Sequence, residues 1–239
     1  LKKYPVCLPE WHNQKEYVNP YVFMDELAKL TKRDAIIVTD AGATLNWTMQ
    51  GYRMRKKQML YSAFNHSPMG YALPASVGAH YSGSENVIAV IGDGSIMMNL
   101  QELETIAYNN IPVKIIVISN NVYTVIRDRQ KDLFRKRTIG TDPSDGVGCP
   151  DFMKVAECFN ISYERIDDSS NLQQKLKSII EMDGPVLCEV MGLDNQEYIT
   201  SSHARNSNKR IVFRPIEDQA PYLDRELFLT EMIINPIDQ

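Results

Sequence analysis

The chain has 239 residues, of which 44% are apolar and 23% are charged, and its net charge at pH 7 is −4. A chain of this length and composition can bury a substantial core, and it carries no basic excess that would favour nucleic acid. No apolar run approaches the roughly 20 residues of a membrane-spanning helix, and Leu1 does not begin a signal peptide pattern. We therefore predict a cytoplasmic protein with no nucleic-acid or membrane partner.

The cysteines also favour a reducing compartment. None of them shows the CxxC spacing that is typical of redox motifs and of many zinc and iron–sulfur sites. They are Cys7, Cys149, Cys158 and Cys188. We expect all of them to be reduced thiols.

The first predicted elements follow an irregular lead-in. Residues 1–18 contain prolines and charges without periodicity, so we interpret them as a linker that enters a domain at 19–194. Asn19-Pro20 is a typical helix start, and the apolar residues that follow it recur on one helical face.

Two strands and a helix come next. Residues 35–39 form the first predicted strand and residues 60–64 a short second one. Residues 69–81 read as a helix whose small residues permit close approach of another backbone or a ligand. Pro74 is expected in the first turn of this helix or at a bend.

The most informative stretch begins with an apolar strand at Val87–Ile91, as expected where a parallel strand is covered on both faces. Gly92-Asp93-Gly94-Ser95 then ends the strand in a tight turn. The glycines let the backbone bend sharply and approach a ligand closely, while Asp93 places a carboxylate at the carboxyl end of the strand. Asn99 reads as the N-cap of the next helix, with Glu102 as its capping partner.

A second buried strand, 113–118, delivers Asn120 and Asn121 to the same edge of the sheet as Asp93. Ligands of open parallel sheets lie outside the carboxyl ends of the strands, so Asp and Asn side chains that leave two such ends can share a cation. Mg²⁺ suits this pair because it takes one or two protein side-chain oxygens and completes its shell with water, carbonyl and phosphate oxygens. The pattern therefore indicates a magnesium site that holds a phosphorylated ligand.

Strands and helices continue to alternate beyond the Asn pair. The expected elements are a loop at 138–148, a helix at 150–159, a strand at 161–166, a helix at 172–182 and a strand at 186–190. This alternation predicts an α/β fold with a doubly wound, mainly parallel six-stranded sheet and helices on both faces. Regularity fades over 195–239, a C-terminal tail that either wraps a neighbouring subunit or is plain surface.

The segment around GDGS resembles the diphosphate-binding signature of thiamine diphosphate enzymes, and most closely the C-terminal pyrophosphate-binding domain of acetolactate synthases. Residues 69–75, MGYALPA, are similar to the MGYGLPAA run of those enzymes, and residues 112–115 match their PVKI. The likeness extends from about Tyr17 to Gly192. It implies the thiamine diphosphate-binding fold, with thiamine diphosphate and Mg²⁺ as cofactors.

The resemblance also implies site residues. Asp93 and Asn120 would bind Mg²⁺ through their side chains, and Val122 would bind it through its carbonyl oxygen. A shift of one residue in the register would put Asn121 in the place of Asn120. The remaining implied cofactor contacts are Gly42, Ala43, Thr44, Met69, Gly92, Gly94, Ser95 and Tyr123.

The stretch after the Asn pair departs from acetolactate synthases, which carry a GMVxQWQ-like run there. Registering from Asn120 puts Val125 at the methionine of that run and Arg129 at its tryptophan. Their places in this run make Val125 and Arg129 substrate-site candidates. A guanidinium cannot pack as an indole does, and it favours carboxylate, phosphate or polyhydroxy groups. The alternative is that Arg127, Arg129 and the basic residues up to Arg137 form a solvated helix face.

The resemblance implies an enzyme, a transferase or lyase, that decarboxylates a 2-oxo acid and can ligate the product to a second carbonyl. The catalytic glutamate of the family lies on a pyrimidine-binding domain, which we do not find in this sequence. We therefore expect that domain, in the same full-length protein or in another subunit of a homo-oligomer, to complete the site. Two alternatives stay open: the cofactor subunit of a two-chain 2-oxo acid decarboxylase, and a cofactor-binding or regulatory module without catalysis.

Overall fold

The structure is a computed structural model that describes residues 7–199, 203–205, 211–215, 217–219 and 222–234. The chain divides into two compact units, Leu1–Gln196 and Glu197–Gln239. Among the described residues, no helix has both the length and the apolar character needed to cross a bilayer.

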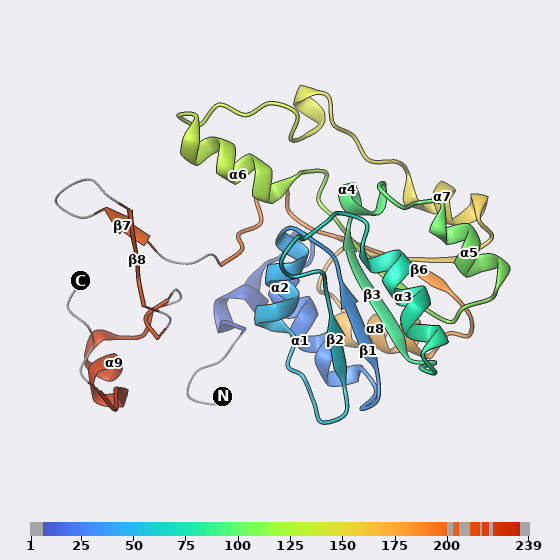
Figure 1. The fold of residues 1–239 in the computed structure, drawn as a ribbon, viewed down its shortest axis with the longest axis horizontal. Helices are drawn as coiled ribbons and strands as arrows, with labels where there is room; N and C mark the ends of the chain where they lie inside the picture. Colours follow the sequence, from blue (N-terminus) through green and yellow to red (C-terminus); the bar gives the residue numbers. More distant parts are fainter. Residues whose placement is uncertain (1–6, 200–202, 206–210, 216, 220–221, 235–239) are drawn as a thin grey trace. The chain divides into compact units, whose positions relative to one another are not determined.

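The first unit is built on one six-stranded parallel sheet with the strand order β2-β1-β3-β4-β6-β5 (Figure 1). The strands are β1 Ile36–Thr39, β2 Met59–Tyr61, β3 Val87–Gly92, β4 Lys114–Ser119, β5 Ser162–Ile166 and β6 Val186–Met191. The central strands β3 and β4 are buried almost throughout, which is why they read as mainly apolar runs in the sequence, with Lys114 and Ser119 as polar residues at the two ends of β4. The predicted doubly wound α/β fold with six strands is confirmed.

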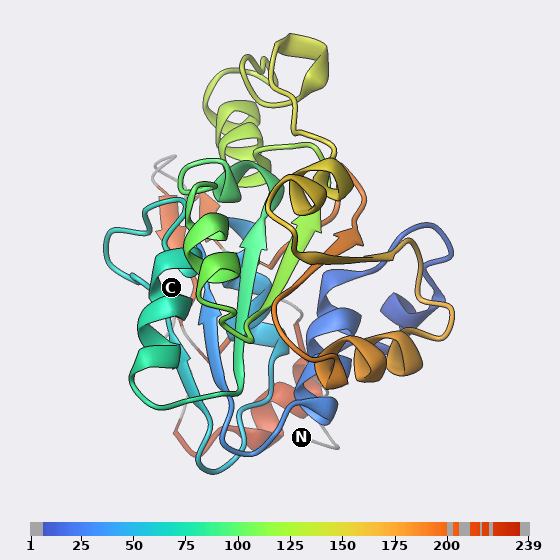
Figure 2. The ribbon, with the colours of Figure 1, turned by 90° about the vertical axis from the view of Figure 1, so that its right-hand side faces the viewer.

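Helices cover both faces of this sheet (Figures 1 and 2). On one face, α3, α5 and α7 share a core with alternate residues of the strands, and on the other α1 packs against both α2 and α8. The helices of the first unit are α1 Pro20–Leu30, α2 Ala43–Gly51, α3 Ala72–Tyr81, α4 Asp93–Ile96, α5 Glu102–Tyr108, α6 Thr124–Leu133, α7 Phe152–Cys158 and α8 Leu172–Glu181, with short 3₁₀ turns η1 Pro9–Asn13 and η2 Pro143–Asp145.

The strand order reverses between β1 and β3. The chain leaves β1 toward β2 at one edge of the sheet, and it leaves β3 in the opposite direction, toward β4. The loops after β1 and β3 therefore separate above the carboxyl ends of these strands, and this is where open α/β sheets bind ligands. Helix α6 projects beyond the same edge (Figure 2).

Several local predictions differ from the structure. Strand β2 is shorter than the predicted 60–64 and begins one residue earlier, and α3 begins at Ala72 rather than at Met69. Asn99 does not cap α5, because the N-cap position of this helix is Gln101. The Asn99 carboxamide instead donates to the carbonyl oxygen of Gly70 at 3.0 Å. A tertiary contact thus replaces the local cap that the sequence favoured.

The second unit is more regular than the sequence suggested for the tail. Its described part contains an antiparallel pair, β7 His203–Arg205 with β8 Ile211–Phe213, and the helix α9 Arg225–Glu231. Asp218 accepts hydrogen bonds from the guanidinium groups of Arg214 and Arg225. These two partners hold the pKa of the Asp218 carboxyl below its usual value.

Candidate functional site

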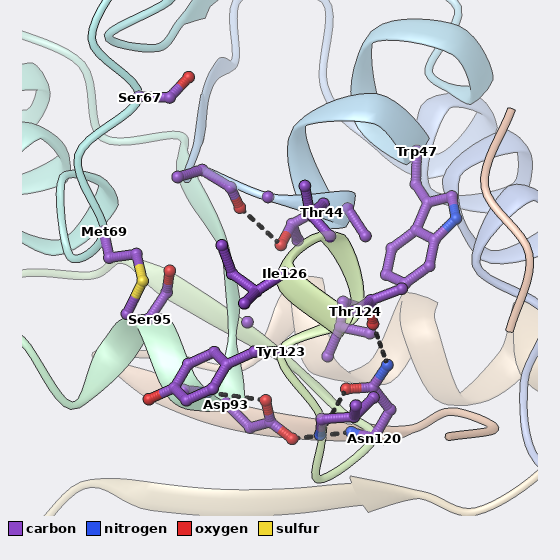
Figure 3. A pocket seen from close by; sticks show the side chains of 18 residues that line it. Thr44, Trp47, Ser67, Met69, Asp93, Ser95, Asn120, Tyr123, Thr124 and Ile126 are labelled. Carbon is purple, nitrogen blue, oxygen red and sulfur yellow. Dashed lines mark hydrogen bonds between the residues drawn. The ribbon is translucent and has the colours of Figure 1, made fainter. Parts of the chain in front are cut away.

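A cavity of about 270 Å³ lies at the carboxyl ends of β1, β3 and β4. Its volume is near the lower end of the range of roughly 300–1,000 Å³ that is typical of small-molecule sites. Residues of three segments line it, 41–44, 92–95 and 118–126 without Ser119 and Asn121, together with Trp47, Ser67 and Met69. Figure 3 shows the side chains that face this cavity.

Asp93 is the only carboxylate that lines this cavity among the described residues, and it is 3% exposed. Its Oδ2 atom accepts hydrogen bonds from the backbone N–H groups of Asn120, at 2.8 Å, and Asn121, at 2.6 Å. Its Oδ1 atom accepts one from the N–H of Gly94, at 2.7 Å. Since a carboxylate offers about four acceptor positions, these three amides fix its orientation and leave capacity for a cation.

Burial raises the pKa of the Asp93 carboxyl, although the three amide hydrogen bonds act in the opposite direction. The thiol of Cys149 also hydrogen bonds to this carboxylate. A thiol is a weak hydrogen-bond donor. A buried carboxylate whose charge is incompletely compensated is the kind of ligand that a divalent cation stabilises.

Asn120 and Val122 supply two further oxygens at the base of the cavity. The Asn120 side chain donates from Nδ2 to the Thr124 hydroxyl at 3.0 Å, and its Oδ1 accepts from the Val122 N–H at 3.3 Å. The Val122 carbonyl accepts from the Thr124 N–H at 3.0 Å and keeps a second lone pair. Figure 3 shows Asp93 and Asn120 next to each other.

Asn121 lies on the other side of this turn. It is exposed, has a left-handed backbone with a φ of 55°, and does not line the cavity. Among the described residues there is no cluster of three His, Cys, Asp or Glu side chains that could hold a metal ion. Asp93, the Asn120 carboxamide and the Val122 carbonyl therefore form the oxygen set that best suits Mg²⁺.

Gly94 forms a close cradle with Tyr123. A Cβ atom on Gly94 would lie 2.9 Å from Cζ of the Tyr123 ring and nearer still to Cε1. The Tyr123 N–H donates to the Thr141 carbonyl at 2.9 Å, which fixes the backbone from which the ring projects. Only glycine at position 94 lets the ring approach the turn that carries Asp93.

The start of α2 forms another wall of the cavity. Gly42 precedes the helix with a φ of 78°, and Ala43 and Thr44 form its first turn, all three lining the cavity. The first N–H groups of a helix lack intrahelical partners, so they suit an anion such as a diphosphate. The Thr44 hydroxyl donates back to the Ala41 carbonyl at 3.2 Å.

The predicted substrate residues differ in position. Val125 lines the cavity, whereas Arg129 is exposed on α6 and does not. Arg127 had been grouped with a solvated basic face, but it is only 7% exposed and donates to the backbone carbonyl of Asp194. The structure thus brings Val125, and neither arginine, to the cavity.

Sequence reasoning missed several lining residues. Trp47 and Thr124 are buried in the cavity wall, and Ile126 extends the wall along α6 although the side chain is half-exposed. Trp47 lies one helical turn after Ala43, a predicted cofactor contact, and this spacing was the available signal, because residues i and i+4 share a helical face.

This combination defines a class of protein: an α/β domain with a ligand cavity at the carboxyl ends of its parallel strands, lined by a buried carboxylate and by the start of a helix. Residues 40–190 match the family described as "Thiamine pyrophosphate enzyme, C-terminal TPP binding domain". The chain belongs to this family, and thiamine pyrophosphate is the same compound as thiamine diphosphate.

Curated relatives agree with this assignment. The chain is 32% identical over 212 residues to the acetolactate synthase large subunit of Pyropia yezoensis, an overlap of 88% of this chain and 35% of the relative. It is also 32% identical to acetolactate synthase 2, chloroplastic, of Zea mays, over 77% of this chain and 30% of the relative. For the mitochondrial acetolactate synthase catalytic subunit of Aspergillus candidus the identity is 31%, over 80% of this chain and 27% of the relative. The chain thus spans about a third of the length of these relatives.

Proposed function

We propose that this chain is the Mg²⁺- and thiamine diphosphate-binding domain of an acetolactate synthase-like enzyme, a transferase or lyase. The observation that carries the proposal is that Asp93 and Asn120 line one cavity at the carboxyl ends of β3 and β4, where the Asp93 carboxylate accepts the backbone N–H of Asn120. When bound, thiamine diphosphate supplies the carbanion chemistry that decarboxylates a 2-oxo acid. The protein residues bind and orient it.

Each wall of the cavity has a task in this proposal. Asp93, Asn120 and the Val122 carbonyl hold Mg²⁺, which neutralises the diphosphate. The N–H groups of 42–44 and of Ser95 would donate to the diphosphate oxygens. Met69 lines the cavity and would contact the bound cofactor, and the largely apolar lining would limit the access of water to it.

Only one of the two predicted substrate residues lines the cavity. Val125 lies at the cavity and contacts the substrate in this proposal, whereas Arg129 reaches it only if α6 changes its position. The pyrimidine-binding domain, on the same full-length protein or on another subunit of a homo-oligomer, provides the missing catalytic carboxylate. A cytoplasmic location is part of the same proposal.

Calorimetric titration of the purified chain with thiamine diphosphate tests the binding function. We expect one-site binding in the presence of Mg²⁺ and none after its removal by EDTA. Asp93→Ala should abolish the binding, whereas Asp151→Asn, a change at the N-terminus of α7 outside the cavity, should retain it. Binding that is indifferent to both Mg²⁺ and Asp93 would contradict the proposal.

Turnover tests the expected need for a second domain. With pyruvate and other 2-oxo acids as substrates, the 239-residue chain alone should release no CO₂ above the uncatalysed rate. Rapid decarboxylation by this chain would show that a second domain is not required. A panel of 2-oxo acids with the complete protein, followed by product identification, would then define donor and acceptor.

A further inference from the structure

The loop that carries Met69 into the cavity is held by a side chain that does not itself line the cavity. Asp40 follows β1 and is completely buried. Its Oδ1 atom accepts hydrogen bonds from the N–H groups of Ala41, at 2.7 Å, and Gly70, at 3.1 Å. Its Oδ2 atom accepts from the N–H of Ala72, at 2.8 Å.

This carboxylate therefore joins three parts of the cavity wall. Ala41 precedes Gly42, Ala43 and Thr44, the proposed contacts of the diphosphate, and Gly70 and Ala72 lie at the start of α3. The hydroxyl of Ser95, in the turn after Asp93, hydrogen bonds to Asp40 as well. The N–H of Gly70 belongs to the peptide bond that follows Met69, so its hydrogen bond to Asp40 fixes the direction in which the Met69 backbone enters the cavity.

A second side chain holds the same glycine from the other side. The Asn99 carboxamide donates to the Gly70 carbonyl oxygen at 3.0 Å. Gly70 has a φ of 84°, and a Cβ atom there would lie 2.8 Å from the Met98 side chain. The glycine is thus fixed by its backbone conformation, by Asp40 at its N–H and by Asn99 at its carbonyl.

We propose that Asp40 is a positioning residue for the cofactor: with Asn99, it holds the Met69–Gly70 peptide so that Met69 can contact thiamine diphosphate. This inference rests on the proposed function. Asp40 acts through Met69 and does not itself touch the cofactor, because it is buried behind the cavity wall.

A carboxamide cannot replace this carboxylate. Both oxygens of Asp40 accept backbone N–H groups, so either orientation of an Asn side chain puts its NH₂ group opposite at least one N–H donor. Leaving a buried donor without an acceptor has a cost that corresponds to roughly a 5- to 150-fold change in an equilibrium constant. We therefore expect Asp40→Asn to weaken thiamine diphosphate binding about tenfold or more.

Trp47 provides a direct readout of binding, because it lines the cavity. The other tryptophan, Trp11, stacks on Tyr21 outside the cavity with ring centroids 4.3 Å apart. A Trp11→Phe parent protein therefore reports thiamine diphosphate binding through Trp47 fluorescence alone. Titrations at saturating Mg²⁺ would give the dissociation constant of each variant.

Asp25 supplies the matched control. It is a buried carboxylate of the same unit, 6% exposed, it pairs with Arg53 and Lys29, and it does not line the cavity. Asp25→Asn should leave the dissociation constant within about twofold of the parent value, a change of the size typical of substitutions remote from a site. An equal loss in both variants would mean that Asp40 acts only through general stability.

A double-mutant cycle tests the route through Met69. If Asp40 positions Met69, then Asp40→Asn should have much less effect on the dissociation constant in a Met69→Ala background than in the parent. Fully additive losses would overturn this route. Should Asp40→Asn fail to fold, Asn99→Ala, which removes the other hydrogen bond to Gly70, is expected to weaken binding about fivefold, and unchanged affinity would overturn the proposal.

Binding by the Trp11→Phe parent protein distinguishes the proposed function from the role of Asp40. If the Trp11→Phe parent shows no Mg²⁺-dependent binding of thiamine diphosphate, the proposed function is contradicted and the role of Asp40 is overturned with it. If the parent binds and Asp40→Asn binds equally well, only the role of Asp40 is overturned.

Discussion

Gly94→Ala is a minimal perturbation of the turn between β3 and α4. Position 94 is helical, so alanine would ordinarily stabilise it by roughly 0.5–1 kcal/mol relative to glycine. The Tyr123 ring reverses this expectation. The added Cβ atom would lie 2.9 Å from Cζ and 3.0 Å from Cδ1 of the ring, where ordinary contacts begin at 3.4 Å.

The ring must therefore move by about half an ångström or more, and overpacking of this kind costs about 1–3 kcal/mol. Tyr123 is only partly buried and borders the cavity, so it can relieve the clash by swinging into the space that the cofactor needs. The cost then appears as lost binding, roughly 5- to 150-fold in the dissociation constant of thiamine diphosphate.

The assay combines calorimetric titration with thiamine diphosphate and Mg²⁺ and unfolding in urea, for Gly94→Ala, Tyr123→Ala and the double variant. Since the clash needs both side chains, adding Gly94→Ala to Tyr123→Ala should no longer lower the free energy of unfolding. A Gly94→Ala protein with unchanged stability and unchanged cofactor affinity would refute the reasoning about this cradle.

Three further predictions concern other residues. Asn120→Ala should abolish Mg²⁺-dependent binding of thiamine diphosphate in calorimetry, whereas Asn121→Gly, which suits the φ of 55° there, should retain it; the reverse result would shift the register by one residue. Because burial raises the pKa of the Cys149 thiol to about 12, its alkylation by iodoacetamide at pH 8, followed by mass spectrometry, should be slow and should accelerate as the pH rises; fast reaction at pH 8 would contradict this. Arg127→Met should lower the free energy of unfolding by about 1–3 kcal/mol, because the backbone carbonyl of Asp194 loses its buried partner. Substitution of the exposed Arg129 by Met should lower it by less than about 0.5 kcal/mol. Equal effects of the two substitutions in urea denaturation would argue against the buried position of Arg127.

The central part of the fold could be predicted because its sequence signals are local. Val87–Ile91 is apolar throughout and 113–118 is apolar except for Lys114, as expected of buried parallel strands. Asn19 caps α1 through its side chain, which accepts from the Tyr21 N–H at 3.0 Å. In each case the residue type and its neighbours determine the structure without distant partners.

The features that the sequence did not predict depend on tertiary contacts. Asn99 has the residue pattern of a helix cap, but its carboxamide reaches Gly70, which lies 29 positions earlier in the chain. Asp40 follows the first predicted strand, 35–39, and only the fold shows that its carboxylate is buried and accepts backbone N–H groups from the start of α3. Arg127 lies among exposed basic residues, and its burial depends on the position of the segment after β6.

The site itself was partly predictable for the same reason. Asp93 and Asn120 follow strands, so their meeting at one edge follows from parallel pairing of β3 with β4. Trp47 and Ile126 lie within helices whose orientation toward the cavity is set by packing. Short-range patterns thus find the residues that end strands more readily than those that line walls.

Anomalous diffraction from crystals soaked with Mn²⁺ and thiamine diphosphate would test the central claim most directly, because Mn²⁺ can replace Mg²⁺ at oxygen sites. We predict one strong peak between the Asp93 carboxylate and the Asn120 carboxamide, in contact with the diphosphate. Cofactor density without a metal peak at these two side chains, or a metal peak at another place, would contradict the claim.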